Sequence, residues 1–276
     1  MKTIIAPTDF SPVSLNAVNY AADLAVAMNL DLALLHICRL PLVFSEIPVP
    51  ADSVKDLIKD AEERLVRLRE DILERVKDRI KVSSEVRVGT VVTEIEDFSA
   101  TLSPYAVVMG TQGGEAVARL IFGSNTIDAM KNLSWPLLVV PPDAKFKSIR
   151  KIGLACDLKK VVETAPVEEL KTLVKQFGAE LHVIHINREG GDQAYGPEII
   201  EESGLLQEML DELHPAYHFL NNVNIDEGLS EYAGKNDLDL VVIIPKKHNL
   251  VDKLFHKSHS KELLLHTHVP VMSVHE

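Results

Sequence analysis

An internal repeat is the feature that most restricts how this 276-residue chain can fold. Residues 31–39 (DLALLHICR) align with residues 180–188 (ELHVIHINR) at an offset of 149, and residues 4–9 align with residues 152–157 at an offset of 148. Near the end of each half, residues 134–140 (SWPLLVV) align with residues 268–274 (HVPVMSV) at an offset of 134. Each copy is as long as an ordinary domain, so the sequence predicts two similar domains in tandem.

The repeat also predicts where the domains begin and end. We expect one domain at residues 1–143 and the other at residues 149–276, joined by a short proline-bearing linker at residues 141–145. The smaller third offset means that the second copy is about 15 residues shorter. We expect the missing residues to lie between its second strand and its second helix.

Apolar strands and amphipathic helices alternate through the first half. Strands are predicted at residues 2–6, 32–37, 82–88, 106–109 and 137–140, and helices after Ser11 and at residues 53–80, 92–102 and 124–133. Repeated β–α–β units form parallel sheets with helices on both faces, and the second half repeats the scheme from residue 151 to residue 274. The predicted fold is therefore α/β, with two doubly wound, five-stranded parallel sheets of the Rossmann-like type, related by a pseudo-twofold axis. In such sheets a ligand binds at the carboxyl ends of the strands, where the strand order reverses.

Composition narrows the range of partners. The formal net charge of −12 repels phosphate backbones and anionic lipids, so neither nucleic acid nor a membrane surface is an expected partner. The apolar stretches are too short to cross a bilayer, and the first residues do not resemble a signal peptide, so we expect a cytoplasmic protein. Cys38 and Cys156 form no CxxC motif and are expected to be reduced thiols.

The segment with the clearest chemical meaning is a glycine-rich loop in the first half. Gly110, Gly113, Gly123 and Ser124 form the pattern G-x2-G-x9-G-S between an apolar strand and a helix. Gly110 lets the chain leave the strand without a Cβ above the sheet edge, and Gly113 permits a positive φ that brings a backbone N–H toward an anion. Gly123 and Ser124 precede or open a helix, whose free N–H groups and dipole favour phosphate. The alternative interpretation of the pattern on its own is a glycine-rich turn with Ser124 as a plain N-cap.

In this strand–loop–helix position the pattern resembles the ATP-binding motif of the universal stress protein family. The resemblance extends over almost the whole chain as two copies, and it includes residues 7–11 (PTDFS) and residues 35–37 (LHI). It implies adenine near Pro7, Thr8, Ile37 and Met109, and Asp9 near the ribose or a phosphate-bound Mg²⁺. It also implies that the phosphates bind Gly110, Gln112, Gly113, Gly123, Ser124 and Asn125. Asp9 has a second interpretation, as a cap of the helix that follows it.

The resemblance leaves three functions open. The first is a regulatory or stress-resistance module that responds to ATP, with or without Mg²⁺. The second is a slow ATPase or autophosphorylating protein, although the loop offers no general base and only Arg119 as a cation. The third is an interaction scaffold without a nucleotide. We favour the first, and we assign neither catalytic residues nor a metal site. His256 and His259 have ligand spacing but secure only two ligands, and His36 and His185 are interpreted as packed polar residues.

The second half departs from the pattern. At the offset of 134, Ile244, Lys247 and Lys257 replace Gly110, Gly113 and Gly123, and only Ser124 is kept, as Ser258. Cys156 and Asp157 keep only the acidic residue of the Pro-Thr-Asp turn. We therefore expect one ATP per chain, with the second half retained for packing or, alternatively, holding a different anion through Lys246, Lys247 and Lys257. The resemblance also implies an intramolecular pseudo-dimer through the last strand of each half, and association into a further homodimer is left open.

Overall fold

Parallel β–α–β units build both halves of the protein, as the alternating pattern of apolar segments predicts. The computed structural model describes residues 2–39, 51–111, 124–187, 196–244 and 268–274. In the first half the elements are β1 (Thr3–Pro7), α1 (Pro12–Met28), β2 (Asp31–Cys38), α2 (Ala51–Val76), β3 (Val82–Val88), α3 (Val91–Leu102), β4 (Ala106–Gly110), α4 (Ser124–Asn132) and β5 (Leu137–Val140). In the second half they are β6 (Lys151–Ala155), α5 (Val161–Thr164), α6 (Val167–Phe177), β7 (Glu180–Asn187), α7 (Pro197–Leu210), the 3₁₀ turn η1 (Asp211–Leu213), β8 (Ala216–Asn221), α8 (Ile225–Lys235), β9 (Leu240–Ile243) and β10 (Val271–Ser273).

The chain forms two compact units, the first reaching Phe146 and the second beginning at Lys147. In the first unit the strand order is β3-β2-β1-β4-β5, and each neighbouring pair is parallel. In the second unit the order is β10-β9-β6-β7-β8, again with parallel pairs. The α/β, doubly wound architecture is thus confirmed in each unit, while the pairing of the two units through their last strands stays a prediction.

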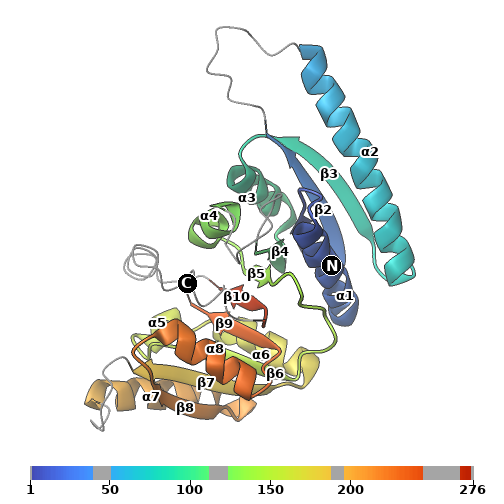
Figure 1. Cartoon of the computed structure of the whole chain (residues 1–276). Coiled ribbons are helices and arrows are strands. Elements are labelled where there is room, and N and C mark those ends of the chain that lie inside the picture. Colours follow the sequence, from blue (N-terminus) through green and yellow to red (C-terminus); the bar gives the residue numbers. More distant parts are fainter. Residues whose placement is uncertain (1, 40–50, 112–123, 188–195, 245–267, 275–276) are drawn as a thin grey trace, which may run out of the picture. The chain divides into compact units, whose positions relative to one another are not determined.

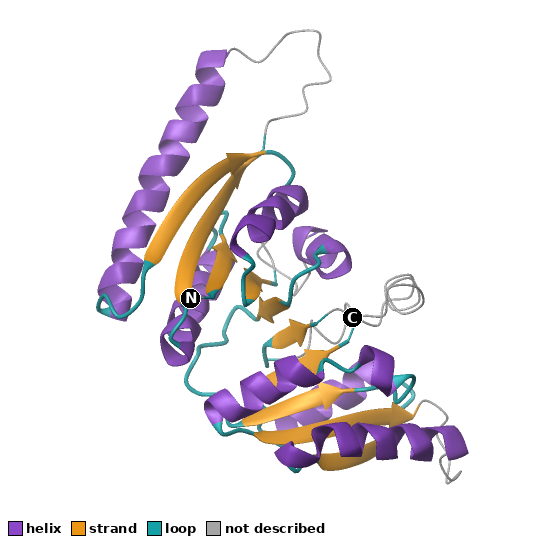
Figure 2. Cartoon of the chain, turned by 180° about the vertical axis from the view of Figure 1, so that it is seen from behind, coloured by secondary structure: helices purple, strands orange, loops and turns teal. Residues whose placement is uncertain are grey.

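Helices cover both faces of the first sheet (Figures 1 and 2). Helix α1 packs on β1, β4 and β5, and α2 packs beside it on β2 and β3. Helices α3 and α4 contact each other and the sheet from the other side. The central strands are consequently buried on both faces, and Ile4, Ile5 and Leu34 have no exposed surface.

Local sequence signals explain where several elements begin or break. Ser11 is the N-cap of α1, as predicted, and its hydroxyl accepts the N–H of Ser14. In the second unit the equivalent helix is broken into α5 and α6 at Pro166. Proline cannot donate the helical N–H and forces the residue before it into extended backbone, as Ala165 shows with ψ 127°.

The position of the shortening in the second copy was predicted wrongly. Helix α2 has 26 residues and its counterpart α7 has 14, so most of the lost residues come from the helix itself and not from the connection before it. A helix can lose whole turns from an end that extends past the sheet without disturbing strand pairing, and β8 still pairs with β7 over six positions.

Candidate functional site

A cavity of about 540 Å³ opens at the carboxyl ends of β1, β2 and β4 in the first unit. Strand order reverses between β1 and β4, because β2 and β3 follow on one side of β1 while β4 and β5 follow on the other. A cleft at this point is where doubly wound sheets bind ligands, and its volume is within the range of small-molecule sites.

Seven of the eleven residues predicted for nucleotide binding line this one cavity. They are Pro7, Thr8, Asp9, Ile37, Met109, Gly110 and Asn125. Ser124 is the first residue of α4, which begins beside the cavity. Gln112, Gly113 and Gly123 lie outside the described residues. The fold therefore brings together residues from three separate parts of the sequence.

Thr8 forms part of the cavity wall, but its polar atoms are committed to the protein. Its hydroxyl accepts the N–H of Phe10 at 3.0 Å and lies 3.0 Å from the Ser14 hydroxyl. Ser14 in turn donates to the carbonyl of Ser11, so the Thr8 hydroxyl proton is directed to Ser14. The Thr8 carbonyl lies 2.8 Å from Nδ1 of His36. Thr8 is thus placed to shape the cavity, and His36, which also lines the cavity, contacts the backbone of the same turn.

Asp9 braces the turn after β1. Its Oδ1 accepts the N–H of Ser11 at 3.0 Å, so it stabilises a turn and does not cap α1, whose N-cap is Ser11. Burial alone would raise the pKa of this carboxyl, but hydrogen bonds from the Ser11 side chain and from the Ser11 N–H help to outweigh burial and lower the pKa. Asp9 therefore presents an ionised carboxylate at the cavity near neutral pH.

Gly110 has a packing reason that the sequence did not suggest. A Cβ at this position would lie 2.8 Å from Cγ1 of Val13 and 2.9 Å from the Val13 carbonyl oxygen. The missing side chain therefore makes room for the first turn of α1, in addition to leaving the cavity open. The Thr126 hydroxyl donates to the Gly110 carbonyl at 2.9 Å, which fixes the end of β4 to α4.

Charged and aromatic residues that sequence reasoning missed also line the cavity. Arg39 follows β2, and Asp60 and Arg64 come from α2. The Arg64 guanidinium lies over the ring of Phe10, 4.2 Å from its centroid, and the rings of Phe10 and His36 are 4.6 Å apart. Helix α2 approaches the cavity only through tertiary packing, so spacing along the chain gives no signal for these contacts.

The backbone of the turn after the first strand is preserved in the second unit, although only the acidic residue of the Pro-Thr-Asp sequence is kept there. Phe10 has φ 63° and Leu158 has φ 51°, both in the left-handed region that non-glycine residues rarely adopt. The Phe10 N–H donates to the Thr8 hydroxyl, and the Leu158 N–H donates to the Cys156 sulfur at 3.4 Å. His185 lies 3.1 Å from the Cys156 carbonyl, as His36 lies against that of Thr8. The second unit therefore keeps the frame of this turn with different side chains.

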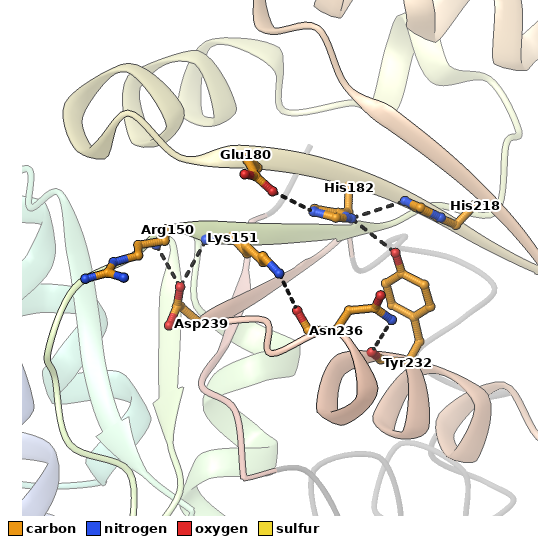
Figure 3. Close-up of polar contacts among 8 residues, drawn as sticks. All are labelled: Arg150, Lys151, Glu180, His182, His218, Tyr232, Asn236 and Asp239. Atoms are coloured by element: carbon orange, nitrogen blue, oxygen red, sulfur yellow. Dashed lines mark hydrogen bonds and ion pairs between the residues drawn. The ribbon is translucent and has the colours of Figure 1, made fainter.

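A separate polar cluster lies in the second unit, on the face of the sheet covered by α8 (Figure 3). Nδ1 of His182 is 3.1 Å from Nε2 of His218 and 3.1 Å from the Tyr232 hydroxyl. Burial, and then the charge of His182, lowers the pKa of His218, and burial raises the pKa of Tyr232. His182 is the third residue of β7, so the cluster is far from the carboxyl ends of the strands. It joins β7, β8 and α8.

A second set of contacts in Figure 3 anchors the start of β6. Asp239 accepts the N–H groups of Arg150 and Lys151 at 2.7 and 3.0 Å, and Lys151 donates to the carbonyl of Asn236. These bonds attach the first strand of the second unit to the turn before β9, and we assign them a structural role.

The described part of the chain contains neither a membrane-spanning helix nor a converging group of metal ligands. No helix there combines the length and the apolar composition needed to cross a bilayer. Nor does a group of three or more histidine, cysteine or acidic residues converge there as a metal site would require. His256 and His259 lie outside the described residues. Cys38 and Cys156 are both buried, and neither forms a disulfide.

Comparison with known proteins agrees with the architecture. The model of the universal stress protein family matches residues 1–141 and again residues 148–275. A universal stress protein of Methanocaldococcus jannaschii is 29% identical over 149 residues, which are 52% of this chain and 84% of that protein.

Two solved structures share the fold over the whole chain. A universal stress protein from Archaeoglobus fulgidus superposes with a TM-score of 0.73 at 18% identity, covering 99% of this chain and 96% of the other. A functionally unknown protein from Pseudomonas aeruginosa gives a TM-score of 0.61 at 14% identity, covering 100% and 92%. With a family match in each half, the chain belongs to the universal stress protein family as a tandem member.

Proposed function

We propose that the first unit binds ATP and that the protein acts as a nucleotide-responsive regulatory or stress-resistance module. The observation that carries this proposal is the single cavity at the strand-order reversal, lined by seven residues chosen from sequence for nucleotide contact. A sheet edge of this kind, next to the N-terminus of α4, suits a ligand with an apolar base and an anionic tail.

The cavity offers matching surfaces for both parts of such a ligand. Ile37 and Met109 are apolar and nearly buried, and they form a surface suited to a planar base. Asn125 and Thr126 open α4 on the same cavity, where a helix N-terminus stabilises phosphate. The Asp9 carboxylate is available to a ribose hydroxyl or to Mg²⁺ accompanying the phosphates.

Isothermal titration of the purified chain with ATP tests the proposal, with and without Mg²⁺. We expect one ATP per chain, because only the first half carries the glycine pattern. Native mass spectrometry should show the same stoichiometry. Absence of ATP binding would refute the function, and two equivalent sites would refute the asymmetry between the halves.

A pair of glycine variants localises the site. Gly123→Val should abolish binding, because its side chain enters the space that the phosphates need. Gly196→Val is the matched control, since a Cβ at Gly196 meets nothing within 4 Å. Gly196 precedes α7, which belongs to the second unit and not to the unit that holds the cavity. ATP at 100 times its dissociation constant stabilises a binding-competent protein by about 2.7 kcal/mol. The control should keep that increment and Gly123→Val should lose it.

A further inference from the structure

Arg39 places a positive charge where the cavity meets the first turn of α4. It directly follows β2, and its side chain is exposed to the cavity. Its Nη2 donates to Oδ1 of Asn125, the second residue of α4. The guanidinium is therefore within hydrogen-bonding reach of the helix end at which an anion would bind.

The other charged groups of the cavity have partners of their own. Arg64 lies over the Phe10 ring and 4.0 Å from Asp60. Asp9 accepts the N–H of Ser11. Arg39, in contrast, has no carboxylate within ion-pair distance among the described residues. Of the two described arginines that line the cavity, it is thus the one whose charge is left for a ligand.

We propose that Arg39 contacts the phosphate chain and makes the cavity selective for nucleoside di- and triphosphates over monophosphates. This inference rests on the proposed ATP binding. A guanidinium has five N–H donors in a planar fork, so it can keep its bond to Asn125 and also bind phosphate oxygens. Asn125 then orients the fork in the free protein, which reduces the conformational entropy lost when the ligand binds.

The position of Arg39 explains the selectivity for nucleoside di- and triphosphates over monophosphates. An added phosphate extends the ligand toward the start of α4 and adds negative charge near the guanidinium. The base contacts at Ile37 and Met109 do not change with phosphate number. Arg64, which lies over Phe10, should respond to the presence of a nucleotide but not to the length of its phosphate chain.

The test compares Arg39→Met with Arg64→Met, two variants with the same change in charge in the same cavity. Dissociation constants for ATP, ADP and AMP are measured by titration at one fixed ionic strength. A hydrogen bond to a charged group corresponds to roughly 10- to 100-fold in affinity. We expect the ATP-to-AMP affinity ratio to fall by about that factor in Arg39→Met and to stay within about twofold of wild type in Arg64→Met. Arg39→Lys, which keeps the charge but not the fork, should give an intermediate ratio.

The outcomes separate this inference from the function on which it rests. If the wild-type chain binds none of the three nucleotides, the proposed function fails and the role of Arg39 fails with it. If wild type binds ATP and Arg39→Met leaves the ATP-to-AMP ratio unchanged, the role of Arg39 alone is refuted. Because Arg39 is exposed, its replacement should leave the unfolding temperature of the free protein unchanged, and that measurement confirms that the variant is folded.

Discussion

Replacing Gly110 with alanine should destabilise the first unit, because the new Cβ collides with α1. The collision involves the Val13 side chain at 2.8 Å and the Val13 carbonyl oxygen at 2.9 Å. The side chain can rotate, but the carbonyl belongs to the first turn of a helix. Reaching an ordinary contact of 3.4 Å from that oxygen requires a backbone shift of about 0.5 Å. Forced shifts of this kind in a packed core cost about 1–3 kcal/mol.

Gly153→Ala is the matched control for this prediction. Gly153 is also in a strand, and its Cβ would lie 2.7 Å from Cδ1 of Leu238 and 3.0 Å from Cδ1 of Ile184. Both atoms are the ends of side chains that can change rotamer, so the loss of stability should be less than half of that for Gly110→Ala. Closeness of contact is therefore similar in the two variants, and only the ability of the neighbour to move differs.

Urea unfolding of both variants checks the magnitude. The two units can unfold in separate transitions, so circular dichroism should be fitted with a two-step scheme where two transitions are resolved. In a thermal scan, each 1 kcal/mol corresponds to roughly 2–4 °C for a unit of this size. A loss of stability in Gly110→Ala that is no larger than in Gly153→Ala would show that α1 moves freely and that the steric reasoning is wrong.

Three further predictions concern positions outside the cavity. Burial and the charge of His182 lower the pKa of His218 below its ordinary 6.5. The unfolded chain therefore binds more protons at this residue than the folded chain, and the free energy of unfolding should fall as pH drops from about 7.5 to 5.5. His218→Gln should flatten this profile in urea unfolding, whereas an equally steep profile in the variant would contradict the assignment. Arg75→Met should cost up to about 1 kcal/mol, less in high salt, because it removes a bidentate ion pair with Asp23. Gly234→Ala, in α8 with nothing within 4 Å of its Cβ, should instead stabilise the protein by about 0.5–1 kcal/mol in the same assay.

The sequence predicted the elements well because their signals are local. Residues 82–88 and 137–140 are strands with the predicted bounds, and α1 begins after its predicted cap, Ser11. Helical spacing within residues 53–80 predicts one apolar stripe of Leu57, Ala61, Leu65, Leu68, Ile72 and Val76. This prediction was largely correct, with Leu65 and Ile72 each 2% exposed. Leu57, at the start of that stripe, is 45% exposed and lines the cavity instead. Helical periodicity thus identified the apolar face but could not show which part of it extends past the sheet.

The candidate site was predictable where its residues belong to a strand end or, as Asn125 does, to the start of the helix after the glycine pattern. Pro7, Ile37 and Gly110 end or lie near the ends of strands, and parallel topology brings such ends to one edge. Arg39 and Arg64 depend on how a loop and a helix pack against that edge. Their contacts join residues that are far apart in sequence, as Arg39 and Asn125 are, so no spacing rule could have paired them.

The two units differ less at the first-strand turn than their sequences suggest. In the first unit, a hydroxyl accepts the N–H of a residue with positive φ, and in the second unit the Cys156 sulfur does the same for Leu158. Left-handed backbone is costly for phenylalanine and leucine alike, so its presence in both units indicates that the surrounding structure enforces it. The same histidine brace accompanies it in each.

This shared turn limits how the second half can differ in function. A different backbone conformation of this turn would by itself explain a loss of nucleotide binding, but the conformation is preserved in the second unit. The expected loss of ATP binding must then come from the positions equivalent to the glycines, where Ile244, Lys247 and Lys257 replace residues that allow backbone to approach phosphate. Ile244 directly follows β9, whereas Lys247 and Lys257 lie outside the described residues. We therefore expect that glycine at all three positions would create weak ATP binding in the second half and raise the stoichiometry in a titration above one per chain. A stoichiometry that stays at one in this variant would show that the side chains at the preserved turn also exclude the nucleotide.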